Sequence, residues 1–413
     1  MRYFTLVFGF LFVVFSCANS VQSNEKATKT TITPPHPSGT PPEEGNLKTG
    51  SDNFTLYLPL LKSKKIGVVT NQSGILSDKT HLVDFLLSKS IDVQQIFAPE
   101  HGFRGTADAG ELIKDGKDTK TGLPIVSLYG DNKKPKSEQL EGIEVLVFDL
   151  QDVGARFYTY ISSLHYVMEA CAENNVQLIV LDRPNPNGGI VDGPILEKEN
   201  TSFVGMHKIP VLHGMTIGEY AQMINGENWL NPSTSFGQHA QCDLKVIPCL
   251  NYKRTMEYNL PVKPSPNLPN AQAINLYASL CFFEGTNVSV GRGTEKQFQI
   301  YGSPFLPKNN FSFTPKPNEG AKDPVHNGKL CYGEDLSKIK KINRLELKWL
   351  LKAYNETSDK SKFFNSFFVK LAGTKKLQEQ IEVGYTEKEI RRTWEDGLDE
   401  FKTMRKKYLL YKD

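Results

Sequence analysis

The sequence predicts an α/β protein in which a doubly wound, largely parallel sheet is followed by a second, smaller α+β domain. Short apolar runs alternate with segments of helical spacing from residue 55 onward. The runs end in turn residues and the connections are short, as in a parallel sheet covered by helices. Beyond residue 302 the composition shifts toward Pro, Asn and Lys, and helical patterns return over 344–413. We place the boundary between a domain over 51–290 and one over 291–413.

The first residues have the pattern of an export signal that is too short to remain as a membrane span. Met1 and Arg2 precede an apolar run that ends at Phe15, which predicts a signal peptide over 1–16. The run continues into Ser16 and Cys17, which resembles a bacterial lipobox and predicts lipidation of Cys17. Ordinary secretion with an incidental cysteine is the alternative. No acidic residue directly follows Cys17 to indicate surface display, so we expect a membrane anchor that faces the periplasm.

Residues 17–50 are expected to form a disordered tether. They are rich in Ser, Thr, Pro, Asn and Lys, and no aromatic side chain occurs after Cys17 in this segment. Such a composition cannot bury enough apolar surface to fold. The prolines between Pro34 and Pro42 would hold a folded domain at some distance from a membrane.

The expected strands follow in order, each as a β-branched or apolar run closed by turn residues. They cover 65–70, 91–98, 124–129, 144–150 and 176–182. Helical spacing is present over 81–87 and 160–174. A further strand over 210–214 precedes Thr216, which is typical of a helix N-cap. We expect the sheet to close near 281–287.

Polar side chains recur where these strands end. Because the carboxyl ends of parallel strands share one edge of the sheet, ligands bind there in open α/β sheets. The most informative stretch is 97–105, where Pro99 ends a strand and a turn carries Glu100 and His101. The other candidates of this kind are Asn71, Ser73, Asp149, Asp152, Asp182, Arg183, His213 and Glu284. Such a rim can hold two carboxyl groups in different environments, as acid/base chemistry requires.

Each candidate also has a plainer interpretation. Glu100 and His101 could belong to a solvated surface turn, and Asp149 could bond neighbouring backbone. Asp182 and Arg183 could form a local ion pair, and His213 could be a buried histidine with satisfied ring nitrogens. Arg156 is harder to dismiss, because an arginine among aromatic residues after a strand suits a sugar face or a carboxylate.

Several classes of function are disfavoured. Lys and Arg number 49 against 46 Asp and Glu, so no basic field indicates nucleic acid. The glycine-rich phosphate motifs and the GxSxG nucleophile motif are absent, and we expect no cofactor. The histidines are scattered and no CxxC pair exists, so we expect no metal. Cys242 and Cys249 are the one pair close enough in sequence to suspect as a disulfide.

Five ordered motifs together resemble the exo-β-N-acetylmuramidase family. The resemblance covers about 55–413 and rests on 70–74, 99–105, 149–156, 182–186 and 284–287. It implies a Rossmann-like domain, a smaller carboxyl-terminal domain and an active-site cleft between them. It also implies hydrolysis of terminal N-acetylmuramic acid from the non-reducing end of peptidoglycan fragments, in cell-wall recycling or scavenging.

Under that resemblance Glu100 would protonate the leaving glycosidic oxygen and His101 would orient it or the sugar. A second carboxylate would act as base or nucleophile, and it would come from Asp149, Asp152, Glu111 or Glu284. The lactyl carboxylate of muramic acid would be bound by Arg104, Arg156 or Arg292. A non-catalytic sugar-binding lipoprotein, with Phe157, Tyr158 and Tyr160 stacked on a sugar ring, is the alternative. A nucleotide-dependent enzyme is a third interpretation, and a homodimer stays open.

Overall fold

The structure is a computed structural model that describes residues 45–100, 102–103, 115–230 and 241–412. Residues 45–413 form one compact unit. The expected signal peptide, Cys17 and most of the expected tether lie outside the described residues. Within the described residues, no helix is both long enough and apolar enough to cross a membrane.

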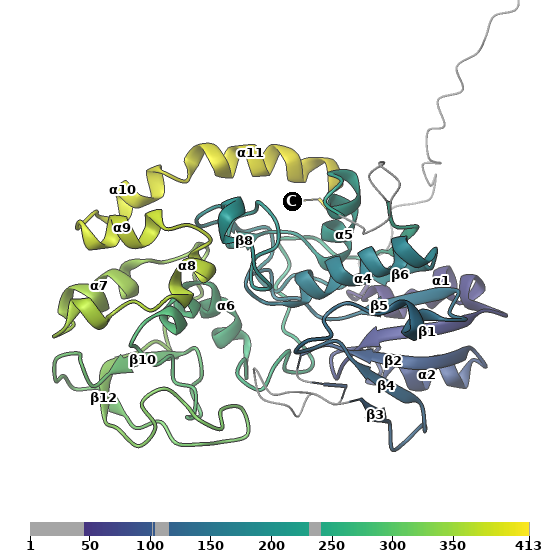
Figure 1. The fold of residues 1–413 in the computed structure, drawn as a ribbon, viewed down its shortest axis with the longest axis horizontal. Helices are drawn as coiled ribbons and strands as arrows, with labels where there is room; N and C mark the ends of the chain where they lie inside the picture. The colour runs from purple at the N-terminus through teal and green to yellow at the C-terminus, as the bar shows by residue number, and fades with distance from the viewer. Residues whose placement is uncertain (1–44, 101, 104–114, 231–240, 413) are drawn as a thin grey trace, which may run out of the picture. The chain divides into compact units, whose positions relative to one another are not determined.

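A seven-stranded sheet forms the middle layer of the larger part of the fold, at the right of Figure 1. In spatial order its strands are β3 (Gly116–Lys117), β4 (Pro124–Ser127), β2 (Asp92–Ala98), β1 (Lys65–Thr70), β5 (Val145–Asp149), β6 (Gln177–Leu181) and β9 (Leu244–Ile247). Every neighbouring pair is parallel except β3 with β4. The parallel strands therefore run third, second, first, fourth, fifth and sixth along the chain, which is the Rossmann order. The predicted α/β class is confirmed.

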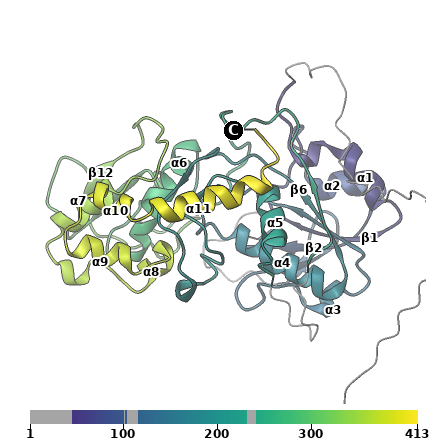
Figure 2. The ribbon, with the colours of Figure 1, turned by 90° about the horizontal axis from the view of Figure 1, so that it is seen from above.

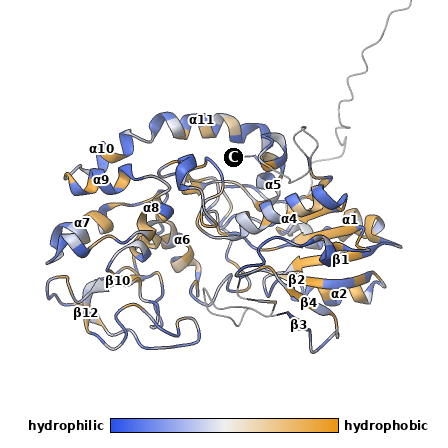
Figure 3. Ribbon diagram, in the orientation of Figure 1, coloured by the Kyte–Doolittle hydropathy of each residue, from blue (hydrophilic) through white to orange (hydrophobic). Residues whose placement is uncertain are grey.

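The central strands are buried on both faces. In β5, Val145 and Val147 face one core, whereas Leu146 and Phe148 face the other, because successive strand side chains point to opposite faces. The first core is closed by α1 (Phe54–Leu61) and α2 (Leu82–Ser88), and the second by α4 (Tyr160–Asn174) and α5 (Ile217–Gly226). Figure 3 shows hydrophobic residues along much of this sheet. The apolar runs of the sequence are thus double-sided strands in a doubly wound sheet.

Local signals place α5 as expected. Thr216 caps it, since its Oγ1 accepts a hydrogen bond from the Glu219 amide at 3.3 Å, and the Glu219 carboxylate accepts one from the Thr216 amide at 3.0 Å. This reciprocal capping box satisfies two amides that the first helical turn leaves unpaired. The predicted N-cap is confirmed.

The carboxyl-terminal part is smaller and mixes helices with a three-stranded antiparallel sheet. That sheet has the order β10 (Ile300–Ser303), β12 (Cys331–Asp335) and β11 (Ser312–Phe313). Its helices are α7 (Lys348–Glu356), α8 (Phe367–Ala372), α9 (Lys376–Glu382), α10 (Glu387–Arg392) and α11 (Glu395–Arg405). Figure 2 shows α11 running back from this part toward α5. Phe282, Tyr301 and Leu345 belong to the same hydrophobic cluster as Phe148, so the core continues from the large sheet into this part.

The remaining elements lie before, between or after those already described. They are η1 (Gly50–Asp52), α3 (Ser137–Leu140), β7 (Val191–Asp192), η2 (Lys198–Asn200), β8 (Leu212–His213), α6 (Ala271–Leu280), η3 (Cys281–Gly285), η4 (Lys360–Lys362) and η5 (Lys406–Tyr408). The expected strand over 210–214 is reduced to β8, which pairs with β7 and forms an isolated bridge from Leu212 to Ala155 rather than joining the large sheet. The sheet does not close near 281–287, because β9 is its edge strand and Cys281–Gly285 forms η3. An edge strand of four residues with partly exposed side chains leaves only a weak apolar signal in the sequence.

The folded chain also begins earlier than the expected end of the tether at residue 50. Lys48 forms a backbone bridge to Leu250, and the Gly50 amide donates to the Asp182 carbonyl at 2.7 Å. A side chain at Gly50 would meet the Ile247 carbonyl oxygen and the backbone of Asp182, so only glycine fits there. Backbone pairing of a polar segment leaves no trace in its composition, which explains the error.

The suspected Cys242–Cys249 disulfide is not present. Cys171, Cys242, Cys249, Cys281 and Cys331 are all free and buried. The Cys249 thiol donates instead to the Asp182 carbonyl oxygen at 3.3 Å. Proximity in sequence was therefore a poor guide to pairing.

Candidate active site

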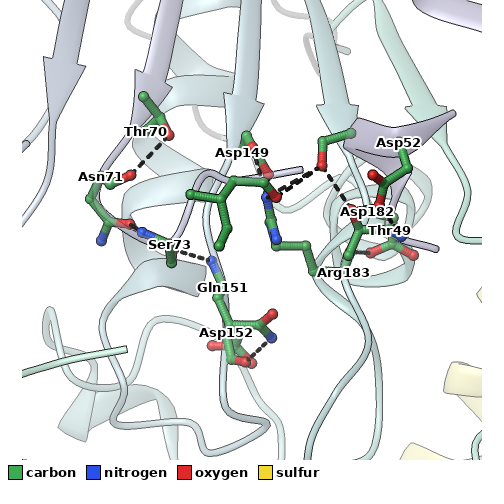
Figure 4. Close-up of polar contacts among 12 residues, drawn as sticks. Thr49, Asp52, Thr70, Asn71, Ser73, Asp149, Gln151, Asp152, Asp182 and Arg183 are labelled. Atoms are coloured by element: carbon green, nitrogen blue, oxygen red, sulfur yellow. Dashed lines mark hydrogen bonds and ion pairs between the residues drawn. The ribbon is translucent and has the colours of Figure 1, made fainter. Parts of the chain in front are cut away.

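The topological switch point of this sheet lies between β1 and β5, where a Rossmann sheet usually binds its ligand. Figure 4 shows that polar side chains of the protein occupy it. The Arg183 guanidinium forms a two-point ion pair with Asp149, with Nε–Oδ1 at 2.6 Å and Nη2–Oδ2 at 2.9 Å. Arg183 Nη2 also donates to the Ile75 carbonyl at 3.0 Å. The crevice is therefore filled by the chain itself.

Asp149 and Arg183 consequently have a structural role. Their side chains are 0% and 1% exposed. Burial alone would lower the pKa of the Arg183 guanidinium, but the adjacent Asp149 carboxylate raises it above its ordinary value. We reassign Asp149 from catalysis and Arg183 from substrate binding to this ion pair. The sequence analysis considered an ion pair for Arg183, but with Asp182 as its partner.

Asp182 is equally committed to the fold. Its carboxylate accepts hydrogen bonds from Thr216 Oγ1 at 2.7 Å, from the Gly218 amide at 2.7 Å and from Tyr411 Oη at 2.6 Å. Burial, and after it the negative charge of Glu219, raise the pKa of the Asp182 carboxyl to about 7. Because Asp182 is fully buried, we reassign it from substrate binding to a structural role. Its hydrogen bonds join β6 to α5 and to the segment around Tyr411.

Arg156 binds backbone rather than substrate. Its Nη1 donates to the carbonyls of Pro194 and Ile209, both at 2.8 Å, and its Nη2 donates to those of Leu371 and Ala372 at 2.9 and 2.7 Å. The side chain is completely buried, and burial lowers the pKa of its guanidinium to about 9. The two carbonyls at the end of α8 carry the negative end of the helix dipole, which suits a cation.

His213 and Asp152 form a separate buried pair. His213 Nε2 lies 3.4 Å from Asp152 Oδ2, which also accepts a hydrogen bond from the Gly154 amide at 2.7 Å. His213 Nδ1 accepts from the Met215 amide at 3.3 Å. Neither residue lines the pocket described next, so the structure does not bring Asp152, a candidate for the second carboxylate, or His213, a candidate for substrate binding, into that pocket.

Four predicted site residues do come together, around a cavity of about 240 Å³ that we call the aromatic pocket. They are Glu100, Tyr158, Glu284 and Arg292. The other side chains of its wall include Tyr129, Phe157, Thr159, Tyr160, Phe203, Tyr277, Phe298 and Phe367. These residues come from the strand ends of the large sheet and from the carboxyl-terminal part, so the pocket lies where the two meet.

Glu100 follows β2 and is held by two neighbours on the α4 side. Thr159 Oγ1 donates to Glu100 Oε2 at 2.8 Å, and Tyr160 Oη donates to the Glu100 carbonyl oxygen at 3.4 Å. The side chain is partly buried. Its position at the carboxyl end of a strand next to the switch point agrees with where such sheets bind ligands.

Asn71 and Ser73 hold Tyr160 in place without lining the pocket. Asn71 Nδ2 donates to Tyr160 Oη at 2.6 Å, and Ser73 Oγ donates to Asn71 Oδ1 at 2.6 Å. The Gln151 amide donates in turn to Ser73 Oγ at 3.1 Å. Both Asn71 and Ser73 are buried and neither lines the aromatic pocket. We reassign them from substrate binding to positioning Tyr160 and the backbone of Glu100.

Glu284 and Arg292 form an ion pair in the pocket wall, with Arg292 Nε 2.5 Å from Glu284 Oε1. The Arg292 guanidinium also lies 5.1 Å from the ring centre of Phe298. Burial alone would lower the pKa of Arg292, but the Glu284 carboxylate raises it above its ordinary value. Side-chain exposures of 23% and 24% leave both groups within reach of a ligand.

Three candidates, His101, Arg104 and Glu111, lie outside the described residues. Thr159 was not predicted, although it contacts Glu100. It stands in the stretch 157–160, which the sequence analysis read only for its aromatic rings. Tyr277 and Phe298 gave no sequence signal, because they come from α6 and a distant loop. Among the described residues, no group of three or more His, Cys, Asp or Glu side chains is placed to hold a metal ion.

Rings that can stack on a sugar, a held carboxyl group and a second carboxylate paired with an arginine are the groups that a saccharide site with acid/base chemistry requires. Together with the α/β frame, they are typical of a carbohydrate-active protein of Rossmann-like fold. Comparison with known families identifies it further. The profiles described as "Exo-beta-N-acetylmuramidase NamZ, N-terminal" and "C-terminal" match residues 66–272 and 275–411. The chain therefore belongs to the exo-β-N-acetylmuramidase NamZ family.

Individual relatives agree. The chain is 39% identical over 396 residues to the peptidoglycan β-N-acetylmuramidase NamZ of Bacillus subtilis (strain 168), covering 88% of this chain and 91% of that protein. Two crystal structures of DUF1343 family proteins from Bacteroides fragilis NCTC 9343 share the fold. The first has a TM-score of 0.81 at 43% identity over 89% of this chain and all of that chain. The second has a TM-score of 0.75 at 28% identity over 89% and 99%.

Proposed function

We propose that the chain is an exo-acting glycoside hydrolase that releases N-acetylmuramic acid from the non-reducing end of peptidoglycan fragments. The observation that carries the proposal is the placement of Glu100 in the aromatic pocket together with the Glu284–Arg292 pair. The activity named for the B. subtilis relative supports it, since that protein is similar along nearly its whole length.

The size of the pocket favours a terminal sugar. A cavity of about 240 Å³ lies below the ~300–1,000 Å³ of typical ligand sites, which suits a single sugar ring. Aromatic walls supply faces for that ring. Arg292 supplies a cation for the lactyl carboxylate that distinguishes muramic acid from glucosamine, through a charge-assisted hydrogen bond.

The reaction adds water across the glycosidic bond. Glu100 would donate its proton to the leaving oxygen as the bond to the anomeric carbon breaks, and Thr159 would orient the carboxyl group through Oε2. We assign Glu284 as the second carboxylate, because Asp149 is engaged in its ion pair with Arg183 and Asp152 does not line the aromatic pocket. Arg292 fixes the position of Glu284 through the contact from its Nε to Glu284 Oε1.

The activity can be tested with residues 45–413, which form a compact unit. We expect release of the chromophore from a 4-nitrophenyl β-N-acetylmuramide but not from the matching β-N-acetylglucosaminide, which lacks the lactyl group. Release from both substrates would show that the enzyme does not recognise the lactyl group. Release from neither substrate would contradict the proposed hydrolysis.

We also propose that the protein is an exported lipoprotein anchored at Cys17 and facing the periplasm. The apolar run through Phe15, the lipobox-like ending and the Pro-rich segment after it support this. Such an anchor would hold the enzyme beside its peptidoglycan substrate. Replacing Cys17 by Ala in the full chain should move the protein from the membrane to the soluble fraction; an unchanged membrane fraction would contradict lipidation.

A further inference from the structure

The outer side of α1 is apolar although it faces solvent. None of the eight residues of α1 has a charged side chain. Only Tyr57 and Leu61 are buried, whereas Phe54 and Leu56 are 39% and 48% exposed. A surface helix normally turns charged and polar residues outward. An outward side without any charge therefore indicates a surface that an apolar partner covers.

The apolar surface continues onto α2. The ring centres of Phe54 on α1 and Phe85 on α2 are 5.4 Å apart. Leu87, also on α2, is 37% exposed. Both helices lie at the right-hand end of the molecule in Figures 1 and 2. We call the outward side of Phe54, Leu56, Phe85 and Leu87 the α1–α2 face. It is shared by two helices that pack on the same core.

Lysines gather where these two helices end. Four of them directly follow α1 and α2: Lys62, Lys64, Lys65 and Lys89. The next strands, β1 and β2, are parallel neighbours whose pairing starts at Lys65 and Asp92, so both helices end at the amino edge of the sheet. Lys89 Nζ lies 5.5 Å from the ring centre of Phe85, which places it beside the α1–α2 face. Asp92 and Glu144 stand at the same strand starts, which leaves an excess of positive charge.

We propose that the α1–α2 face and its four lysines rest on the surface of an anionic phospholipid bilayer. The apolar side chains enter the boundary between head groups and acyl chains, and the ammonium groups pair with lipid phosphates. The position of the face along the chain supports this partner. Only residues 18–44 separate Cys17, the proposed site of lipidation, from Gly45, and a flexible chain of that length spans on the order of 30 Å.

This contact would also orient the active site. Glu100 and the aromatic pocket lie at the carboxyl ends of the strands, whereas the lysines lie at the amino ends. A molecule that rests on the lysines and the α1–α2 face therefore leaves the pocket uncovered for a substrate outside the membrane. A few exposed side chains bind a bilayer only weakly, so the contact orients an anchored protein and does not replace the anchor.

The test uses residues 45–413, which lack Cys17, so its outcome depends neither on lipidation nor on hydrolysis. We expect this unit to sediment at low salt with vesicles of equimolar phosphatidylcholine and phosphatidylglycerol. Its partition coefficient should be about tenfold lower on vesicles of phosphatidylcholine alone, and added salt should release it. Lys62→Gln/Lys64→Gln should lower binding to the anionic vesicles about tenfold as well.

The apolar part is tested by Leu56→Gln/Leu87→Gln, which changes two exposed positions and should lower the partition coefficient about tenfold. The matched control is Leu330→Gln/Val383→Gln, which changes two exposed apolar residues of the carboxyl-terminal part and should bind as the parent does. Absent binding to anionic vesicles, or the same binding by both double variants, would overturn the proposal. So would a parent that dimerises in analytical ultracentrifugation through contacts that Leu56→Gln/Leu87→Gln abolishes, since the face would then belong to a second copy of the chain.

Discussion

At the scale of single residues, burial distinguishes structural carboxyl groups from a candidate catalytic one, a distinction that the sequence could not make. Asp149, Asp182 and Glu100 each stand at or just after the end of a strand. The first two are completely buried and bonded by protein donors, whereas Glu100 is partly buried and lines a cavity. A carboxylate surrounded by donors of the fold has no face left for a substrate, so of these three carboxyl groups only that of Glu100 faces a cavity.

Replacing Glu100 by Gln should therefore lower turnover of the muramyl-glucosamine disaccharide on the order of 10²-fold or more. The loss on the 4-nitrophenyl muramide should be smaller, because a nitrophenolate leaves without needing a proton. Steady-state kinetics on the two substrates measure the difference. Glu138→Gln, on an exposed face of α3, is the control. Near-parental turnover of the disaccharide would exclude Glu100 as the acid.

Asp182 should make stability depend on pH. Its pKa is raised to about 7 in the folded protein, from about 3.9 in the unfolded chain. Between these two pH values the folded state binds one proton more than the unfolded chain. The stabilising contribution of Asp182 is therefore full below about pH 4 and is lost as the pH rises through about 7. The free energy of unfolding of the parent, relative to Asp182→Asn, should fall between pH 5 and pH 8, on the order of 2 kcal/mol. Urea unfolding at both pH values measures it, and a pH-independent difference would contradict the raised pKa.

At the scale of elements, the end of α8 depends on one side chain from the opposite part of the chain. Arg156 follows β5 in the sequence, and its guanidinium bonds the carbonyls of Leu371 and Ala372 at the end of α8. The same group bonds Pro194 and Ile209, so it joins three segments. Because α8 forms part of the pocket wall through Phe367 and Leu371, Arg156 contributes to the site without touching its contents.

Arg156→Met should lower the free energy of unfolding by about 3 kcal/mol or more, since it removes four hydrogen bonds to buried carbonyl groups, of which only that of Ile209 keeps another donor, the Leu196 amide. Arg156→Lys should cost less, because an ammonium group can still bond some of these carbonyls. Chemical unfolding of the three proteins provides the comparison. Parental stability of the Met variant would contradict this role.

At the scale of the whole compact unit, segments near its two ends meet at Asp182. The Gly50 amide donates to the Asp182 carbonyl at 2.7 Å, and Tyr411 Oη donates to the Asp182 carboxylate at 2.6 Å. Tyr411 Oη also accepts from the Cys249 amide at 2.8 Å, and the Tyr411 carbonyl accepts from Arg254 Nη2 at 3.0 Å. Both end segments thus stabilise the edge of the sheet formed by β6 and β9.

Truncations of the unit test this. A chain that begins at residue 45 should be as stable as the longer protein, whereas one that begins at residue 54 should lose stability, because it lacks the pairing of Lys48 and Gly50. Removal of residues 409–413 should also be destabilising, through loss of the Tyr411 contacts. Thermal unfolding compares the forms. A chain starting at 54 that unfolds at the same temperature would show that the amino-terminal segment contributes nothing.

The sequence by itself determined the α/β class, most strands of the sheet, the N-cap of α5 and the position of Glu100 just after a strand, because periodicity, turn residues and capping are local signals. Tertiary structure decided the rest. β9 and the segment near Gly50 are held by backbone pairing, which composition does not record. Asp149 and Arg156 stand near strand ends as Glu100 does, but their surroundings bind them to the fold, and those surroundings come from residues 34 to 216 positions away. Burial and partner identity are properties of the packed fold, and they divide the polar residues into those that support the pocket and those that face its cavity.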